Sequence, residues 1–199
     1  MSQSIILASG STIRAELLAR AGVSFEVMTA RVDEQSIKAS LLAEGESPRN
    51  VADALAQTKA EKIGARVPGA FTIGCDQVLA FDGQIVSKPA RLEEAKRQLQ
   101  MLAGKQHQLH SAAVIVEGGK TVWRKVSDVT MTMRAISDDY LEAYLARNWP
   151  EVSHSCGAYQ VEAEGSRLFS RIQGDYFAVL GLPLLEVLDY LALRGAIES

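Results

Sequence analysis

Residues 5–22 of the chain read IILASGSTIRAELLARAG, an apolar run, a turn of small residues and an amphipathic segment in direct succession. The run 5–8 predicts a buried strand, and the small residues 9–11 predict a tight connection. Apolar residues then recur at helical spacing over 13–21, and Gly22 is a common helix end. A strand that leads at once into a helix is the building unit of α/β folds.

The rest of the chain continues to alternate strand and helix patterns, which predicts an α/β fold. Ser47 and Pro48 predict a helix start, because a hydroxyl cap followed by proline suits a helix N-terminus. Asp82-Gly83 between apolar runs predicts a hairpin with a tight turn, and residues 24–46 are less regular. The predicted helices are 12–21, 48–66, 90–103, 137–147 and 183–194, and the predicted strands are 5–8, 71–75, 78–81, 84–86, 110–116, 121–133, 168–172 and 176–180.

Length and composition favour a globular protein with a small-molecule partner. The 199 residues suit a single domain over 1–199, or one domain with two lobes, and such a chain buries roughly 70% of its unfolded surface. Hydrophobic residues make up 47%, which excludes disorder. The net charge is −3, from 21 basic and 24 acidic residues without a dense basic run. Nucleic-acid binding usually needs a basic face, so nucleic acid is not the expected partner.

Cysteine usage and hydropathy predict a soluble, cytoplasmic protein. Cys75 and Cys156 are too few for a disulfide framework, which favours a reducing compartment. The N-terminus lacks a basic segment followed by a long apolar stretch, so we expect no signal peptide. No run approaches the ~20 apolar residues that span a bilayer, so we expect no membrane partner.

The turn at 9–11 is the first candidate site. A strand, a small-residue turn and a helix start gather free backbone N–H groups, and the helix dipole favours an anion there. Arg14 in the first helical turn opposes that dipole and therefore favours an external anion such as phosphate, which a guanidinium grips with two bonds. The alternative is an ordinary capped helix with Arg14 in solvent.

Lys59 is the second candidate, because it falls inside the apolar stripe of its predicted helix. Leu55 precedes it by four residues and Ile63 follows it by four. Burying an ammonium without a partner is costly, so Lys59 should meet a carboxylate or a phosphate. The alternative is a lysine at the edge of the stripe whose amine reaches solvent.

Asp76 is the third candidate, because it directly follows the predicted strand 71–75. Ligand sites of open α/β sheets gather at the carboxyl ends of strands, and a carboxylate there can hold Mg²⁺ or orient a water. The alternative is a turn aspartate. Weaker signals are the acidic pair Asp33 and Glu34 and the cation Lys88, each of which also fits a solvated loop.

Taken together, these residues resemble the Maf family, relatives of the inosine triphosphatase fold. The resemblance covers almost the whole chain, and its segments come in the family's order. The matching segments are Leu7-Ala8-Ser9-Gly10-Ser11 with Arg14 and Glu16-Leu17-Leu18, Val32-Asp33-Glu34, Lys59-Ala60, Gly74-Cys75-Asp76-Gln77-Val78, Ser87-Lys88-Pro89, Gly157-Ala158-Tyr159, and Gly174-Asp175-Tyr176 with Val179 and Gly181-Leu182-Pro183-Leu184.

The resemblance implies a mixed, curved sheet with flanking helices in two lobes around a central cleft, whereas the residue pattern alone gives only α/β. It implies Mg²⁺- or Mn²⁺-dependent hydrolysis of nucleoside triphosphates between the α- and β-phosphates, and it leaves room for a homodimer. By matching position, Asp76 would be the general base and lie close to the metal, and Glu34 would be a metal ligand. The phosphates would be held by Ser9, Arg14, Lys59 and Lys88, of which the two lysines would act with Asp76 in catalysis.

The resemblance leaves the base preference open among pyrimidines, 7-methylguanine and a broad range. Pyrimidine-specific members often carry Thr at the position of Gln77 and Gln near Glu162, whereas this chain is more similar there to members that act on 7-methyl-GTP. A carboxylate could suit a base with positive charge or N–H donors. The family often has Pro-Arg at Thr12-Ile13. The family's tryptophan-type residue near Ile13 is missing from this chain, and Ile13 cannot stack on a base as an indole would. Ile13, Gln77 and Glu162 are therefore candidate substrate-binding residues.

A non-catalytic, nucleotide-binding regulator of septum formation is the alternative, since Maf proteins are also associated with inhibition of septum formation. Such a module could use the same cations, Arg14, Lys59 and Lys88. The pair Asp76 and Glu34 separates the two hypotheses, because a binder needs no carboxylate pair placed for metal and water.

Overall fold

One mixed sheet of seven strands organises the computed structural model, which describes residues 3–198. The strand order is β2-β1-β3-β5-β6-β7, and β4 pairs with β3 beside this path. β1 is parallel to β2 and β3, and the remaining pairings are antiparallel. The predicted α/β fold, with a mixed sheet flanked by helices, is confirmed. The strands are β1 (Ile5–Ala8), β2 (Glu26–Val27), β3 (Phe71–Phe81), β4 (Gln84–Val86), β5 (Gln106–Glu117), β6 (Lys120–Met133) and β7 (Phe169–Gln173).

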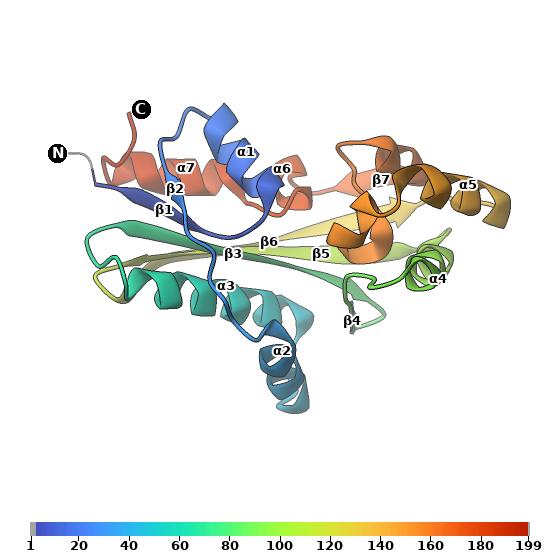
Figure 1. Cartoon of the computed structure of the whole chain (residues 1–199), viewed down its shortest axis with the longest axis horizontal. Coiled ribbons are helices and arrows are strands. Elements are labelled where there is room, and N and C mark those ends of the chain that lie inside the picture. Colours follow the sequence, from blue (N-terminus) through green and yellow to red (C-terminus); the bar gives the residue numbers. More distant parts are fainter. Residues whose placement is uncertain (1–2, 199) are drawn as a thin grey trace.

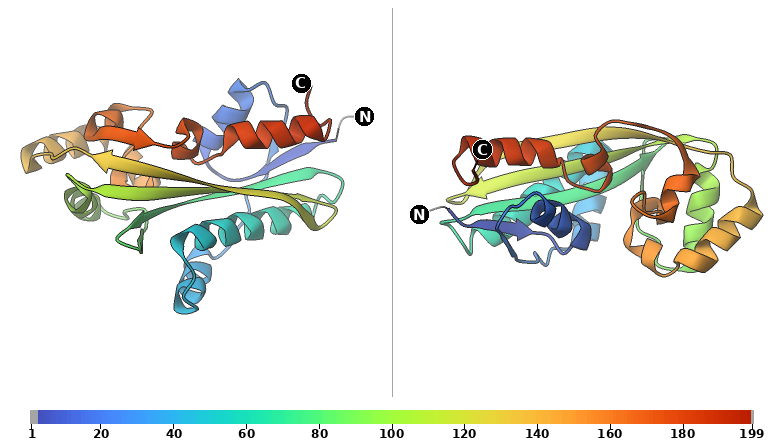
Figure 2. Two further views of the ribbon diagram at one scale, coloured as in Figure 1. Left: turned by 180° about the vertical axis from the view of Figure 1, so that it is seen from behind. Right: turned by 90° about the horizontal axis from the view of Figure 1, so that it is seen from above.

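Helices cover both faces of this sheet (Figure 1). α3 runs along one face with α2 beyond it, and α1 and α7 lie over the other face. α4 and α5 gather at the opposite end of the long strands, as the view from above shows (Figure 2). The helices are α1 (Thr12–Arg20), α2 (Glu34–Ala43), α3 (Pro48–Gly64), α4 (Leu92–Leu102), α5 (Asp138–Asn148), α6 (Tyr176–Val179) and α7 (Leu184–Leu193), with short 3-10 helices at Glu151–His154, Cys156–Ala158 and Glu164–Leu168.

The two ends of the sheet have separate hydrophobic cores. At one end, α1 and α7 pack on β1 and β3 around residues such as Leu18, Phe71 and Val187, and α3 packs on the opposite face. At the other end, α4 and α5 pack on β5 and β6 around residues such as Leu99 and Tyr144. The sheet therefore carries one lobe at each end, and residues near its middle lie between them.

A gap in strand pairing opens the edge of β3 between the two lobes. β1 pairs with β3 as far as Ala8 and Gly74, and β4 pairs with the same edge only from Leu79 onward. Residues 75–78 therefore have a strand neighbour on the β5 side but none from β1 or β4. Asp76 and Gln77, two of the candidate site residues, lie in this stretch without a strand neighbour on one edge.

The structure corrects three predictions of local structure. The predicted strand 176–180 is the helix α6, whose start Asp175 caps by accepting a hydrogen bond from the Ala178 N–H at 2.7 Å. The less regular stretch 24–46 contains α2, capped by Asp33. The predicted strand 71–75 does not end at Asp76, because β3 continues to Phe81.

Other predictions are confirmed. Ser47 caps α3 and Pro48 is its first residue, and the two long strands β5 and β6 form a hairpin. The turn between β3 and β4 has positive φ at both Asp82 and Gly83, 48° and 76°, which is the geometry that a tight two-residue hairpin needs. Between residues 3 and 198, no helix combines the length and apolar character that crossing a bilayer would require.

Candidate active site

Asp76 lies in the gap of β3 and is paired with Lys59. The Asp76 side chain is 8% exposed, and its Oδ1 accepts a hydrogen bond from the Lys59 Nζ at 2.6 Å. Lys59 reaches this point because α3 lies almost on the strand: a Cβ on Gly74 would be only 2.2 Å from the Ala56 carbonyl oxygen. The predicted burial of Lys59 in the apolar stripe, and its need for a carboxylate or phosphate partner, are thus confirmed.

Glu34 completes this charged group. Its Oε1 lies 2.7 Å from the same Lys59 Nζ, so one ammonium bridges carboxylates from α2 and β3. Burial alone would lower the pKa of Lys59, but Asp76 and Glu34 outweigh burial and raise it above its ordinary value. Burial would raise the pKa of Glu34, and Lys59 outweighs it so that the pKa is lowered. Both partners therefore stay charged at neutral pH.

Arg14 lies on the other side of the gap and is buried, so the alternative of a solvent-exposed arginine is wrong. Its Nε donates to the Gly181 carbonyl oxygen at 2.7 Å, and its Nη1 contacts the Cys75 carbonyl oxygen and the Ser9 Oγ, each at 3.2 Å. These partners are neutral, so they hold the guanidinium in place without cancelling its charge. Among the contacts of the described residues, its Nη2 has no hydrogen bond, which leaves those N–H groups for a ligand.

Ser9 joins Arg14 to the start of α1. Its Oγ also accepts a hydrogen bond from the Ser11 N–H at 3.2 Å, which fixes the predicted turn. The first turn of α1 holds no acidic residue, and Ser11 makes no side-chain capping bond. The helix N-terminus therefore keeps free donors beside Arg14, as the prediction of an anion site requires.

Two further lysines border the Glu34 side of the gap. Lys88 is exposed just after β4, and Lys38 is half-buried one helical turn beyond Glu34 on α2. The positive charges of both act on Glu34 and lower its pKa after the larger effect of Lys59. Sequence reasoning missed Lys38, because the apolar pair Ile37 and Leu41, four residues apart, was too weak a signal to predict the helix that puts Lys38 at i+4 from Glu34.

The three candidate base-reading residues have different surroundings. Gln77 is half-buried, and its side-chain nitrogen donates to neighbouring acceptors. Ile13 is half-buried on α1, and Glu162 is exposed in the turn before the last 3-10 helix. Neither Ile13 nor Glu162 forms an ion pair or hydrogen bond with the charged group in the described part of the chain, so their assignment stays a prediction.

The donor set fits a hard divalent cation that takes part of its shell from the ligand. Asp76 and Glu34 supply two carboxylates, and no group of three or more His, Cys, Asp or Glu residues is placed for a metal within residues 3–198. Mg²⁺ is typically bound by one or two carboxylates together with substrate phosphates and waters. Burial raises the pKa of the Cys75 thiol to about 11, which argues against thiolate ligation or nucleophilic chemistry there.

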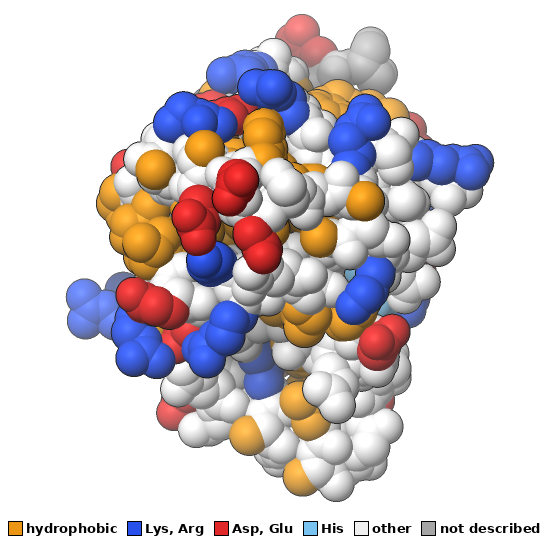
Figure 3. Space-filling view, turned by 90° about the vertical axis from the view of Figure 1, so that its right-hand side faces the viewer, with side chains coloured by type: hydrophobic (Ala, Val, Ile, Leu, Met, Phe, Trp, Pro, Cys, Tyr) orange, Lys and Arg blue, Asp and Glu red, His pale blue; other side chains and the backbone are white. Residues whose placement is uncertain are grey.

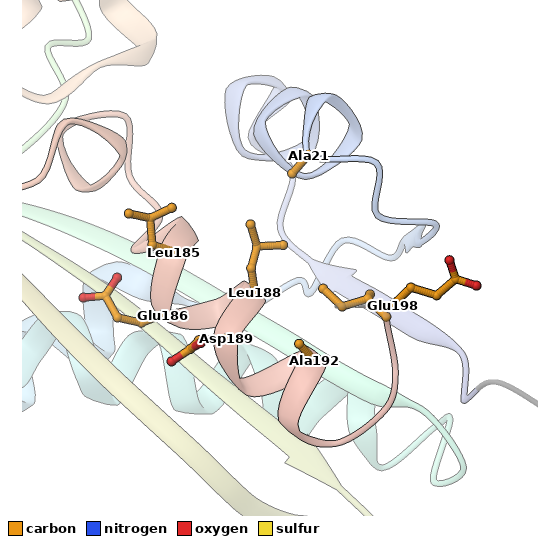
Figure 4. Close-up of a pocket in the computed structure, with 8 residues that line it drawn as sticks. Ala21, Leu185, Glu186, Leu188, Asp189, Ala192 and Glu198 are labelled. Atoms are coloured by element: carbon orange, nitrogen blue, oxygen red, sulfur yellow. The ribbon is translucent and has the colours of Figure 1, made fainter.

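Two other surfaces are less suited to a polyphosphate. A hollow of about 540 Å³ lies between the end of α1, α7 and the chain's C-terminal tail (Figure 4), and its charged lining residues Glu186, Asp189 and Glu198 are all acidic. Over the face that carries α4 and α5, lysines and arginines are interspersed with acidic side chains (Figure 3). The gap in β3 is where cations and carboxylates converge.

Fold and site define a class: a mixed α/β protein whose cations and carboxylates meet beside one unpaired stretch of the sheet, which suits a phosphorylated ligand. The chain belongs to the Maf family, because the family model described as Maf-like protein matches residues 4–193. It is 55% identical over 199 residues to the nucleoside triphosphate pyrophosphatase of Ruegeria pomeroyi, covering 100% of both chains.

Other relatives are similar over the same extent. The nucleoside triphosphate pyrophosphatase of Roseobacter denitrificans is 56% identical over 195 residues, covering 98% of each chain. The 7-methyl-GTP pyrophosphatase of Mesorhizobium japonicum is 46% identical over 199 residues, covering 100% of each chain. Relatives with both names therefore match along the whole fold, including the segments that form the gap.

Proposed function

We propose that this chain hydrolyses nucleoside triphosphates between the α- and β-phosphates, with Mg²⁺ or Mn²⁺, at the gap in β3. The coarser statement, that the chain is a nucleoside triphosphate pyrophosphatase, follows from its family and from full-length relatives of that name. The observation that supports the finer one is the Lys59 bridge between Asp76 and Glu34, which puts two carboxylates together on one ammonium.

The proposed roles follow from charge. Asp76 and Glu34 would hold the divalent cation, which when bound neutralises phosphate charge and polarises the scissile phosphoryl group. Asp76 would accept the proton of the water that attacks the α-phosphorus, and pyrophosphate would leave. Lys59 would then turn from the carboxylates toward the phosphates. Phosphate oxygens would also be contacted by Ser9, Arg14, Lys88 and the additional lysine Lys38.

A carboxylate pair distinguishes this proposal from a nucleotide-binding regulator of septum formation. Binding a triphosphate needs cations, whereas the proposed hydrolysis also needs a group that takes a proton from water. Asp76 is held against Lys59, and the 41% exposed Glu34 side chain on the same ammonium connects this group to the surface, which suits that task. The following experiment would identify such a regulator by nucleotide binding without turnover.

The test compares wild type with Asp76→Asn on common NTPs and dNTPs, 7-methyl-GTP and modified pyrimidine triphosphates, each with Mg²⁺ or Mn²⁺. We expect monophosphate and pyrophosphate from wild type, and turnover lower by about 10²–10⁴-fold in Asp76→Asn with binding retained. Asp82→Asn is the matched control, because Asp82 lies in the nearby hairpin turn, where Asn tolerates positive φ. Binding without turnover in wild type would move the proposal to the regulator, and full activity in Asp76→Asn would remove Asp76 from its role.

A further inference from the structure

We propose that Gln77 is a positioning residue, which fixes the segment from α6 to Gly181 and, through the Gly181 carbonyl, orients Arg14 toward the phosphates. This inference rests on the proposed function, since it assigns Arg14 to the substrate. It replaces the base-reading role expected for Gln77 from the sequence. It starts from the hydrogen bonds that the Gln77 amide makes on the α1 and α7 side of the sheet.

The surroundings of Gln77 determine which way its amide points. Three acceptors surround the Nε2: the Ala178 and Val179 carbonyl oxygens at 3.0 and 2.9 Å and the Ser111 Oγ at 2.9 Å, which share its two N–H groups. The Ser111 hydroxyl itself donates to the Ala178 carbonyl oxygen at 2.6 Å, so it can only accept from Gln77. All three partners require a donor, and the NH₂ group must therefore face them.

The Ala178 carbonyl is the point at which this network meets α6. It accepts hydrogen bonds from Gln77, from Ser111 and, at 3.0 Å, from the backbone N–H of Gly181. Ala178 and Ser111 are fully buried, so water cannot replace these donors without a cost. Two side chains from neighbouring strands thus fix the end of a helix of only four residues, which is too short to be stable by itself.

Gly181 connects the end of α6 to Arg14. Its carbonyl oxygen accepts from the Arg14 Nε at 2.7 Å. Its φ is +95°, and a Cβ at this position would lie 3.0 Å from that Nε and 3.1 Å from the Nη2. The guanidinium therefore lies directly against the Gly181 backbone, and a shift of α6 would move the carbonyl that aims Arg14.

The base-reading and positioning roles predict different responses to Gln77→Glu. This change keeps the shape of Gln77 and an oxygen at the Oε1 position, but it puts an oxygen and a negative charge against three acceptors. A base reader that acts through Oε1 would keep its preference among nucleotides. A positioning residue would lose its hold on α6, and the effect would be equal for all nucleotides because they share the triphosphate.

The experiment measures kcat and KM on the nucleotide panel for wild type, Gln77→Glu and Ser111→Ala, with Gln108→Glu on the exposed side of β5 as the matched control. We expect kcat/KM to fall by about 10–100-fold in Gln77→Glu and about 3–10-fold in Ser111→Ala, by the same factor for every nucleotide. A changed ratio between nucleotides, or unchanged kinetics in both variants, would overturn the proposal. A lower melting temperature with unchanged constants would show a structural role only, which also overturns it.

A binding measurement separates this proposal from the proposed hydrolysis. If wild type binds a non-hydrolysable triphosphate but turns over none of the panel, the hydrolysis fails while the positioning role can still be tested. The dissociation constants of the two variants should then rise by an equal factor for purine and pyrimidine analogues. Dissociation constants equal to those of wild type would overturn the positioning role. If Gln77→Glu does not fold, Ser111→Ala carries the same test, because it removes both a donor to Ala178 and an acceptor of Gln77.

Discussion

Arg14 and Lys59 are both buried cations beside β3, but the chain satisfies them by different means. Lys59 meets two carboxylates, so its group carries a net negative charge of one. Arg14 meets two backbone carbonyls and a hydroxyl, so its full positive charge remains. This difference in charge supports the proposed places of the metal ion beside Lys59 and of the phosphates beside Arg14. The difference shows that burial alone does not tell what a cation is for; the charge of its partners does.

After Asp76→Asn, Lys59→Ala should have the largest effect on the difference between the two sides of the gap. Without the ammonium, Asp76 and Glu34 face each other uncompensated and repel a triphosphate. We expect affinity for the triphosphate to fall by about 100-fold, since charged hydrogen bonds contribute about 1.5–3 kcal/mol each. The loss of binding free energy should be larger than the loss in the free energy of unfolding. Calorimetry with a non-hydrolysable analogue and a melting curve give the two values, with the exposed Lys120→Ala as control. A collapsed melting temperature with unchanged KM would assign Lys59 to structure alone.

Arg14→Lys tests the other side of the gap. Lysine keeps the charge but has no planar fork, so it cannot reach Gly181, Cys75 and a phosphate together. We expect KM to rise about tenfold for all nucleotides, which corresponds to about 1.4 kcal/mol. Steady-state kinetics check it, with the exposed Arg66→Lys as control. Unchanged KM would mean that charge alone suffices at this position.

Lys38→Gln should have a smaller effect, because Lys38 is only half-buried. Partly exposed charges contribute about 0.2–1 kcal/mol, so we expect KM to rise by about two- to fivefold. The rise should shrink at high salt, where screening weakens the charge in wild type as well. KM measured at two ionic strengths, with Lys120→Gln as control, tests this. A loss that does not depend on salt would speak against an electrostatic role.

The smallest expected effect is the pH dependence of stability that Glu34 contributes. Its pKa in the folded chain is lowered from 4.5, so its stabilisation is present above pH 4.5 and is lost as pH falls through the folded pKa. The pKa of Lys59 is raised from 10.5, so its contribution is present below pH 10.5 and is lost as pH rises through its folded pKa. Glu34→Gln should therefore lose less stability than wild type between pH 7 and about pH 3, by at most about 1 kcal/mol.

Melting curves at both pH values test this prediction. Glu26→Gln is the control, because Glu26 is exposed and forms no ion pair in the described part of the chain. Equal acid sensitivity of wild type and Glu34→Gln would mean that the Glu34–Lys59 contact adds nothing to folding.

The elements that could be predicted are those with a local signal. The strand, turn and helix at 5–22 and the Ser47–Pro48 start of α3 follow from caps, small residues and apolar spacing. Lys59 could be predicted to need a partner because its helix has a clear apolar stripe. α2 has no buried residue, and only Ile37 and Leu41 of it pack partly buried on the core, which is a weak apolar stripe. α6 consists of Tyr, Phe, Ala and Val, three of which favour strands.

The partners in the site could not be read from local pattern. Arg14 finds Gly181, 167 residues away, through a bond to a backbone oxygen that any residue type would offer. Gln77 likewise contacts backbone carbonyls about 100 residues away. Side chains that bond to the main chain leave no complementary residue in the sequence, whereas the acid partners of Lys59 could at least be anticipated by charge.

The gap in β3 has a consequence for aggregation. An open strand edge is a template on which another chain can add a strand, and proteins usually shorten, cover or charge such edges. Here the open segment is only residues 75–78, bounded by β1 on one side and β4 on the other, and Asp76, paired with Lys59, lies within it. The unpaired stretch in the middle of the sheet is thus too short to offer an edge on which intermolecular strands could grow.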